Sequence, residues 1–151
     1  MTTCVALLRA VNVSGHQPVA MADLRRLMGD LGFGDAQSLL QSGNLVFGGA
    51  TGGTARLEER LEREMTARLG LVTDVMVRTA AEWRALVAAN PFRAEAERDP
   101  ARLVVAFLKE PTSAKAVAAL RAAIVGRERA MGREERGRRR DAGRRACRPT
   151  G

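Results

Sequence analysis

The chain of 151 residues has few of the residue types that build metal sites, disulfide frameworks and aromatic binding surfaces. It contains no tyrosine, one tryptophan and one histidine, and its two cysteines, Cys4 and Cys147, lie at opposite ends. A single histidine with two remote cysteines gives too few ligands for a zinc site, and this cysteine spacing gives no disulfide framework. We therefore expect a reduced, cytoplasmic protein with no metal and no other cofactor.

Long apolar runs are also missing from the sequence. No stretch approaches the roughly 20 apolar residues that cross a bilayer. The short apolar run near the N-terminus has no basic residue before it and ends at Arg9, which is not typical of a signal peptide. The glycine patterns of phosphate-binding loops and dinucleotide-binding folds are absent as well. We therefore expect a globular protein with no membrane partner, and the sequence leaves open whether it is an enzyme.

Charge is distributed unevenly along the chain, which carries a formal net charge of +8. Residues 126–151 hold ten arginines and four acidic residues, so this tail alone carries +6. The other 125 residues hold 15 basic and 13 acidic groups, which leaves +2. The basic character therefore belongs to the tail rather than to a face of the fold.

The first 78 residues alternate between strand and helix patterns. Short apolar runs predict strands over 3–9, 38–42, 45–47 and 73–78, and helical spacing of apolar residues predicts helices over 21–31 and 54–69. Thr54 is expected to cap the second helix and Gly70 to end it. The Gly43-Asn44 pair is typical of a tight hairpin turn. The order β-α-β-β-α-β predicts an α+β, ferredoxin-like split-βαβ domain over residues 1–78.

A second, partial α/β unit is predicted over residues 79–125. It has an apolar strand at 103–108 between two helices, over 79–88 and 112–124, the first of which is capped by Thr79. The helical side chains expected to face a core are Trp83, Leu86, Val87, Val117, Leu120 and Ile124. Because no later strands follow, we expect the strand around Val104 and Val105 to have an exposed edge or to dock onto the first domain.

Two short segments carry a resemblance to a known family. The first, VALLRAVNVSG, runs from Val5 to Gly15, and the second, LLQSGNLVF, runs from Leu39 to Phe47. With the apolar helix between them, they resemble the bacterial domain of unknown function 1697 family, whose members open with a similar ALLRGINVGG segment and an IQSGNVVF hairpin. The resemblance covers about residues 1–125. It implies no particular reaction, because no activity is established for the family.

The tail over residues 126–151 departs from this resemblance. It is rich in arginine and glycine and has no apolar periodicity, so it cannot bury enough surface to offset the entropy cost of ordering. We expect a disordered or loosely helical tail. One interpretation is a basic arm that binds nucleic acid through its phosphates. Composition favours another, a frame change in a gene of high GC content, which would leave a truncated family member without independent activity.

The two family-like segments also predict a binding site. In a split-βαβ fold the first two strands run parallel, so both end at the same edge of the sheet. The residues expected to converge there are Arg9, Asn12, Ser14, Gly15, His16, Gln41, Ser42, Gly43 and Asn44. Glycines let backbone amides approach a ligand and arginine provides a forked donor, so we expect a polar or anionic small molecule. The alternative is that the asparagines, serines and glycines serve only the turns.

The acidic residues of the helix over 54–69 predict no site. Glu58, Glu59, Glu62 and Glu64 are interleaved with arginines at helical spacing. This pattern is typical of a solvated face of paired charges. It therefore predicts no carboxylate site on this helix.

Overall fold

The computed structural model describes residues 2–13, 18–126 and 128–132. Backbone contacts divide it into two compact units, with the division between Glu110 and Pro111. The first unit holds the sheet and every described element up to Glu110, and the described part of the second holds one helix. The sequence-based boundaries at 78 and 125 concern independent folding and stay predictions.

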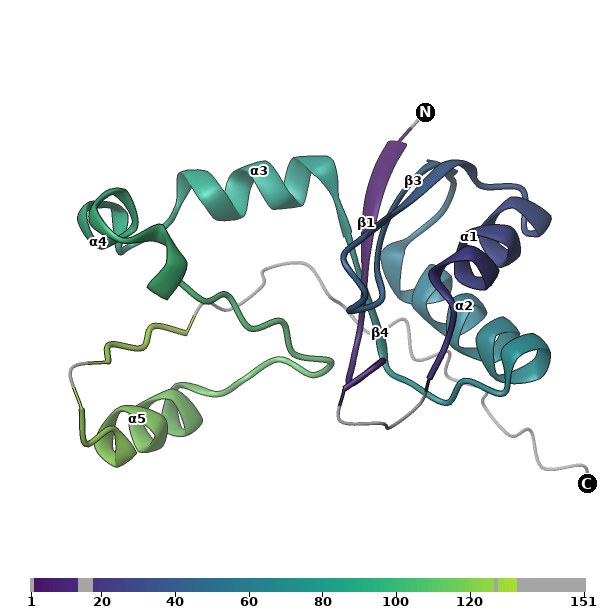
Figure 1. Ribbon diagram of the computed structural model, residues 1–151. Coiled ribbons are helices and arrows are strands. Elements are labelled where there is room, and N and C mark those ends of the chain that lie inside the picture. The colour runs from purple at the N-terminus through teal and green to yellow at the C-terminus, as the bar shows by residue number, and fades with distance from the viewer. Residues whose placement is uncertain (1, 14–17, 127, 133–151) are drawn as a thin grey trace, which may run out of the picture. The chain divides into compact units, whose positions relative to one another are not determined.

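Four strands form one sheet: β1 (Thr2–Leu8), β2 (Gly34–Leu39), β3 (Asn44–Ala50) and β4 (Val75–Thr79). Their order across the sheet is β2-β3-β1-β4, and every neighbouring pair is antiparallel. Helices α1 (Met21–Asp30) and α2 (Thr54–Leu69) both lie on one face of this sheet (Figure 1). This is the ferredoxin-like split-βαβ arrangement, so the predicted α+β fold class is confirmed.

The hydrophobic core lies between the sheet and these two helices. In β1, buried and half-buried residues alternate because successive side chains of a strand point to opposite faces. The buried side chains are Cys4, Ala6 and Leu8 from β1, Met21, Leu24, Leu27 and Met28 from α1, and Leu57, Leu61 and Met65 from α2. The helical stripes are those that the apolar spacing of the sequence predicts.

The hairpin between β2 and β3 differs from the prediction. β2 ends at Leu39 and not at Ser42, and β3 begins at Asn44, so the connecting loop has four residues. Leu40 and Gly43 have φ values of 60° and 78°, in the left-handed region, which stops the strand early. The predicted tight turn centred on Gly43 and Asn44 is therefore wrong. β2 is an edge strand without a buried residue, so its sequence carries no apolar alternation to mark its ends.

Two of the three predicted helix boundaries are confirmed. Gly70 ends α2 in the left-handed conformation, with φ of 62°. Thr79 caps the helix after β4 through a capping box with Glu82. The expected cap Thr54 is instead the first residue of α2, because Gly53 occupies the N-cap position.

The elements after β4 are short: α3 (Ala80–Ala88), α4 (Arg93–Arg98), the 3-10 turn η1 (Pro100–Arg102) and α5 (Ala114–Ala123). None of these four elements contains a buried residue. Val87 and Leu120 are 62% and 56% exposed, contrary to the prediction, and Trp83, Leu86, Val117 and Ile124 are half-buried. An amphipathic pattern is buried only where another element covers it, and α3 and α5 are not covered in this way.

The apolar segment over residues 103–108 is not a strand, so this prediction is wrong. A strand forms only when its backbone pairs with a neighbour, and the segment pairs with no strand in the part of the chain that the structure describes. Val104 is accordingly 81% exposed.

None of the helices within residues 2–13, 18–126 and 128–132 is long and apolar enough to span a membrane. Most of the predicted arginine-rich tail, residues 133–151 and residue 127, lies outside the described residues.

Candidate functional site

Asn12 connects the loop after β1 with the loop after β2. Its Nδ2 donates hydrogen bonds to the carbonyl oxygen of Gln41 (2.9 Å) and to that of Val19 (3.0 Å). Its Oδ1 accepts a third bond from the Val19 amide, at 2.8 Å. The Asn12 backbone has φ of 54°, which asparagine tolerates better than most residues. The amide group of Asn12 therefore holds the two loops together.

Gly43 is required by the close approach of the hairpin loop to the end of β1. A Cβ atom at this position would lie 3.1 Å from the Cβ of Leu8 and 3.2 Å from that of Val11. The next residue, Asn44, donates from Nδ2 to the Ser42 hydroxyl at 3.0 Å. The polar side chains of this loop are thus partly used to shape the loop itself.

Arg9 lies on the other side of the same edge, next to the segment that leads into β4. Its backbone amide donates to the Asp74 carbonyl (3.0 Å), and its carbonyl accepts from the Thr73 hydroxyl (2.7 Å). Its guanidinium pairs with the Asp74 carboxylate at 3.1 Å, with the side chains 73% and 45% exposed. An exposed ion pair of this kind is worth at most about 1 kcal/mol, so Arg9 can exchange this partner for another anion at little cost.

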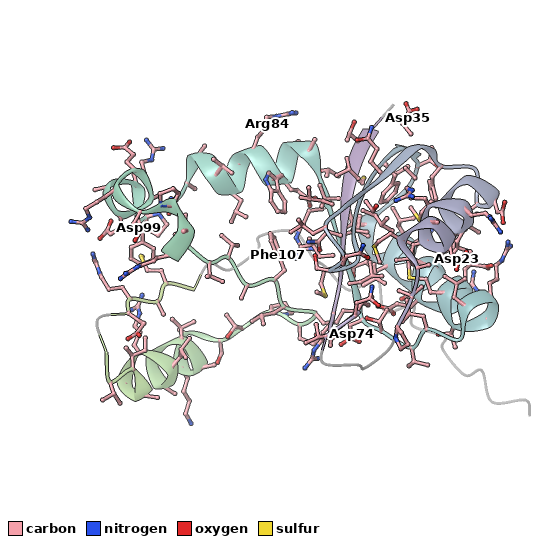
Figure 2. The ribbon with its side chains drawn as sticks, viewed as in Figure 1. Asp23, Asp35, Asp74, Arg84, Asp99 and Phe107 are labelled. Carbon is pink, nitrogen blue, oxygen red and sulfur yellow. The ribbon has the colours of Figure 1, made fainter. Side chains whose placement is uncertain are left out.

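A shallow hollow of about 730 Å³ adjoins Arg9. It is lined by Arg9, Ala10, Glu62, Arg63, Thr66, Ala67, Val72, Thr73 and Asp74, and Figure 2 shows Asp74 at this end of the sheet. Of the candidate residues, only Arg9 belongs to this lining, and neither Asn12 nor Gln41 does. The hollow therefore combines two arginines with two carboxylates beside the loops that Asn12 joins.

Three of the candidate residues, Ser14, Gly15 and His16, lie outside the described residues. Within the described ranges, the histidine, cysteine, aspartate and glutamate side chains form no group of three or more that could hold a metal ion. The chemistry visible at this edge is therefore that of hydrogen bonds and ion pairs.

The sequence of this chain matches one protein family over most of its length. Residues 1–136 match the family described as "Protein of unknown function (DUF1697)". The chain belongs to this family. No curated protein matches the DUF1697 chain.

One solved structure similar to this DUF1697 chain is that of the conserved bacterial protein SP0830 from Streptococcus pneumoniae. The two share 28% sequence identity with a TM-score of 0.53. The match covers 60% of this chain and 49% of SP0830, so the chain spans about half the length of that protein.

The sequence missed a charged cluster along the outer edge of β4. The interpretation of the α2 glutamates as a solvated, paired face is wrong for Glu58 and Glu62, whereas Glu59 is exposed and Glu64 pairs with Arg63 and Arg68 as predicted. Glu58 is 3% exposed, and its Oε1 accepts a hydrogen bond from the Val77 amide at 2.8 Å. Glu62 accepts likewise from the Val75 amide at 2.8 Å. Each of these glutamates directly follows a buried leucine of α2 in the sequence, and this border position beside the apolar stripe could have indicated their burial.

Cys4 is also an ionisable group in the interior of this DUF1697 chain, and it is 1% exposed. Burial raises the pKa of the Cys4 thiol above its usual value, and the Glu82 carboxylate raises this pKa further. The thiol therefore stays protonated at neutral pH, which excludes Cys4 as an activated nucleophile.

Proposed function

We propose that the edge of the sheet where β1 and β2 end binds a small polar or anionic molecule of the cytoplasm. The proposed contact to the anionic group comes from Arg9 in the hollow. The polar residues of the adjoining loops, 13–16 and 41–44, are proposed to contact the rest of the ligand. Arg9 would bind the anionic group through its guanidinium, which suits a carboxylate or a phosphate. Asn12 is proposed as a positioning residue, because all of its amide hydrogen bonds are made to the backbone.

The observation that carries this proposal is the exposed guanidinium of Arg9 beside a hollow, on a backbone that is hydrogen-bonded to the segment before β4. The Arg9 backbone is bonded on both sides to the segment before β4, and Asn12 fixes the neighbouring loops. A fixed backbone reduces the ordering cost of binding. The exposed Asp74 carboxylate keeps the guanidinium oriented toward the hollow until an anion displaces it.

The test uses the full chain and inorganic phosphate as the first anionic probe, followed by a panel of small polar metabolites in a thermal-shift assay. We expect phosphate to raise the melting temperature of the wild-type chain and Arg9→Ala to lose this shift. Arg84→Ala is the matched control, because Arg84 is exposed on top of α3 (Figure 2) and does not line the hollow.

Two results would overturn the proposal. One is a wild-type chain whose melting temperature responds to neither phosphate nor any member of the panel. The other is a shift that Arg9→Ala retains in full or that Arg84→Ala loses equally, since the anion would then act on the overall charge and not at the hollow.

A further inference from the structure

The outer edge of β4 is occupied by side chains where another sheet would have a fifth strand. Among the described strands β4 pairs with β1 alone, and the amides of residues 75, 77 and 79 face away from β1. An edge of this kind normally presents a row of unpaired amides and carbonyls, which can pair with another chain. In this structure the amides of Val75, Val77 and Thr79 donate to Glu62, Glu58 and Glu82, at 2.8, 2.8 and 2.7 Å.

The outward carbonyls of β4 are bonded as well. Lys109 donates from Nζ to the Val75 carbonyl at 2.9 Å and also contacts Glu58 and Glu62. Arg78 folds back to donate to the Val77 carbonyl at 2.8 Å, and its guanidinium lies 3.6 Å from Glu58. Cations therefore take the place of the amides of an absent strand, and carboxylates take the place of its carbonyls.

The spacing of the two secondary structures explains why α2 can do this. Glu58 and Glu62 are four residues apart, about 6 Å along a helix. Val75 and Val77 are two residues apart, about 6.6 Å along a strand. The spacing of the two carboxylates along α2 is therefore nearly the same as the spacing of the two outward amides along β4.

The segment that carries Lys109 is fixed by an aromatic contact. The ring of Phe107 stacks on Trp83 with 5.5 Å between ring centroids, and the Arg78 guanidinium lies 5.1 Å from the Phe107 ring. Figure 2 shows Phe107 beside the sheet, on the side away from α1 and α2. This contact holds residues 107–109 along β4, so that Lys109 reaches the Val75 carbonyl.

We propose that Glu58, Glu62 and Lys109 close the β4 edge against a second copy of this chain. Without them, β4 of one copy would pair antiparallel with β4 of another about a two-fold axis, since an isologous contact brings the same edge from both copies together. The other edge strand, β2, is protected differently, by a register shift between Gly34 and Gln37 and an exposed Asp35 with φ of 49°. The inference concerns self-association and does not depend on ligand binding at Arg9.

The experiment compares the wild-type chain with Glu62→Ala and Lys109→Ala, whose side chains are half-buried, so that the buried pair of Glu58 and Arg78 remains. Sedimentation velocity over a concentration series, with reductant present, measures self-association. Amide hydrogen exchange measures the protection of residues 75–79. Glu59→Ala is the charge-matched control on the exposed face of α2, and Glu62→Gln retains an acceptor oxygen without the charge.

We expect Glu62→Ala and Lys109→Ala to self-associate more tightly than the wild-type chain, whereas Glu59→Ala and Glu62→Gln behave like it. In dilute Glu62→Ala, the Val75 amide should exchange about tenfold faster than in the wild type, as for the loss of one hydrogen bond. At high concentration its protection should return, because a second β4 then accepts the bond.

The proposal is overturned if both alanine variants sediment like the wild-type chain at every concentration. It is also overturned if Glu59→Ala associates as strongly as Glu62→Ala, which would make net charge the cause. Association that leaves the β4 amides unprotected at high concentration would place the contact elsewhere on the molecule and would equally refute it.

Discussion

Apolar side chains of residues 2–79 form a buried core, whereas those of residues 80–132 stay half-buried or exposed. Among the described residues, every buried hydrophobic one lies between Cys4 and Val77, whereas α3, α4, η1 and α5 contain none. Leu61 of α2 is fully buried, but Val104 and Val125 are 81% and 99% exposed. Both regions have helices with apolar spacing, so the pattern alone does not decide burial. The apolar side of a helix is buried only where a face of the sheet is available to cover it.

The β4 edge explains part of this difference. The apolar segment at 103–108 follows the sheet closely enough for Phe107 and Lys109 to contact it, yet it forms no strand. The outward backbone groups of β4 are already bonded to Glu58, Glu62 and other side chains. The segment is therefore held by side chains rather than by a ladder of backbone hydrogen bonds, and most of its apolar surface stays exposed.

The largest expected effect comes from Glu58→Ala, which removes a buried ion pair at the β4 edge of the sheet. The side chains of Glu58 and Arg78 are each 4% exposed, so the variant leaves a buried cation and the Val77 amide without this partner. We expect the free energy of unfolding to fall by about 3–5 kcal/mol. Urea titration followed by circular dichroism measures it.

Glu59→Ala is the control for this prediction, because Glu59 is the exposed neighbour on the same helix. Its expected change is below about 0.5 kcal/mol. Equal losses in the two variants would contradict the assignment of Glu58 to a buried ion pair.

The contrast between the two regions is tested directly by Leu61→Ala and Leu120→Ala. Leu61 is fully buried under the sheet, so its truncation should cost about 2–5 kcal/mol through lost burial and a cavity. Leu120 is 56% exposed on α5, and its truncation should cost less than about 0.5 kcal/mol. Urea midpoints measured side by side give the comparison. A cost at Leu120 equal to that at Leu61 would mean that α5 is buried in solution.

The sequence predicted the fold well where burial leaves a periodic pattern. The stripes of α1 and α2 and the alternation of β1 all face the core, so their residues repeat every 3.6 or 2 positions. It failed at β2, whose residues are half-buried or exposed and therefore show no such repeat. It also failed at 103–108, because an apolar run shows that a segment avoids water but not whether an edge is available to pair with it.

The meeting of the two loops was predictable from the sequence, but their contacts were not, and the binding site itself stays a prediction. Strand order puts the loops with Asn12 and Gln41 at one edge, and the hydrogen bond between them shows that they meet. The sequence could not show that the Asn12 side chain would bond to the backbone, or that Asp74, sixty-five residues from Arg9, would pair with it. The contact of Arg9 depends on the connection before β4, which has no sequence motif of its own.

The helix caps offer a smaller test of the two regions. Thr79 accepts from the Glu82 amide at 3.1 Å where β4 leads into α3, and Ser113 accepts from the Ala116 amide at 3.1 Å at the start of α5. We expect Thr79→Ala to lower the free energy of unfolding by about 1 kcal/mol. Ser113→Ala should shift the urea midpoint far less, because α5 can fray without exposing a buried residue.

Trp83 fluorescence reports the unfolding of the first unit, and far-ultraviolet circular dichroism reports helix content before urea is added. A loss of helix signal in Ser113→Ala without a shift in the fluorescence midpoint would show that α5 unfolds independently of the sheet. The same midpoint shift in both variants would instead show that α5 unfolds together with the sheet.

The smallest expected effect is a pH dependence that arises from Cys4 inside the core. Burial raises the pKa of this thiol above its value of about 8.5 in an unfolded chain, so the folded state keeps its proton longer. The contribution to stability is complete below pH 8.5 or so and is lost as pH rises through the folded pKa, because ionisation then favours the unfolded chain. Urea unfolding between pH 7 and about pH 10, under reducing conditions, should show a steeper decline for the wild type than for Cys4→Ala. Parallel curves would mean that water reaches the Cys4 thiol. The core under the sheet would then differ less in burial from the region after β4 than the structure indicates.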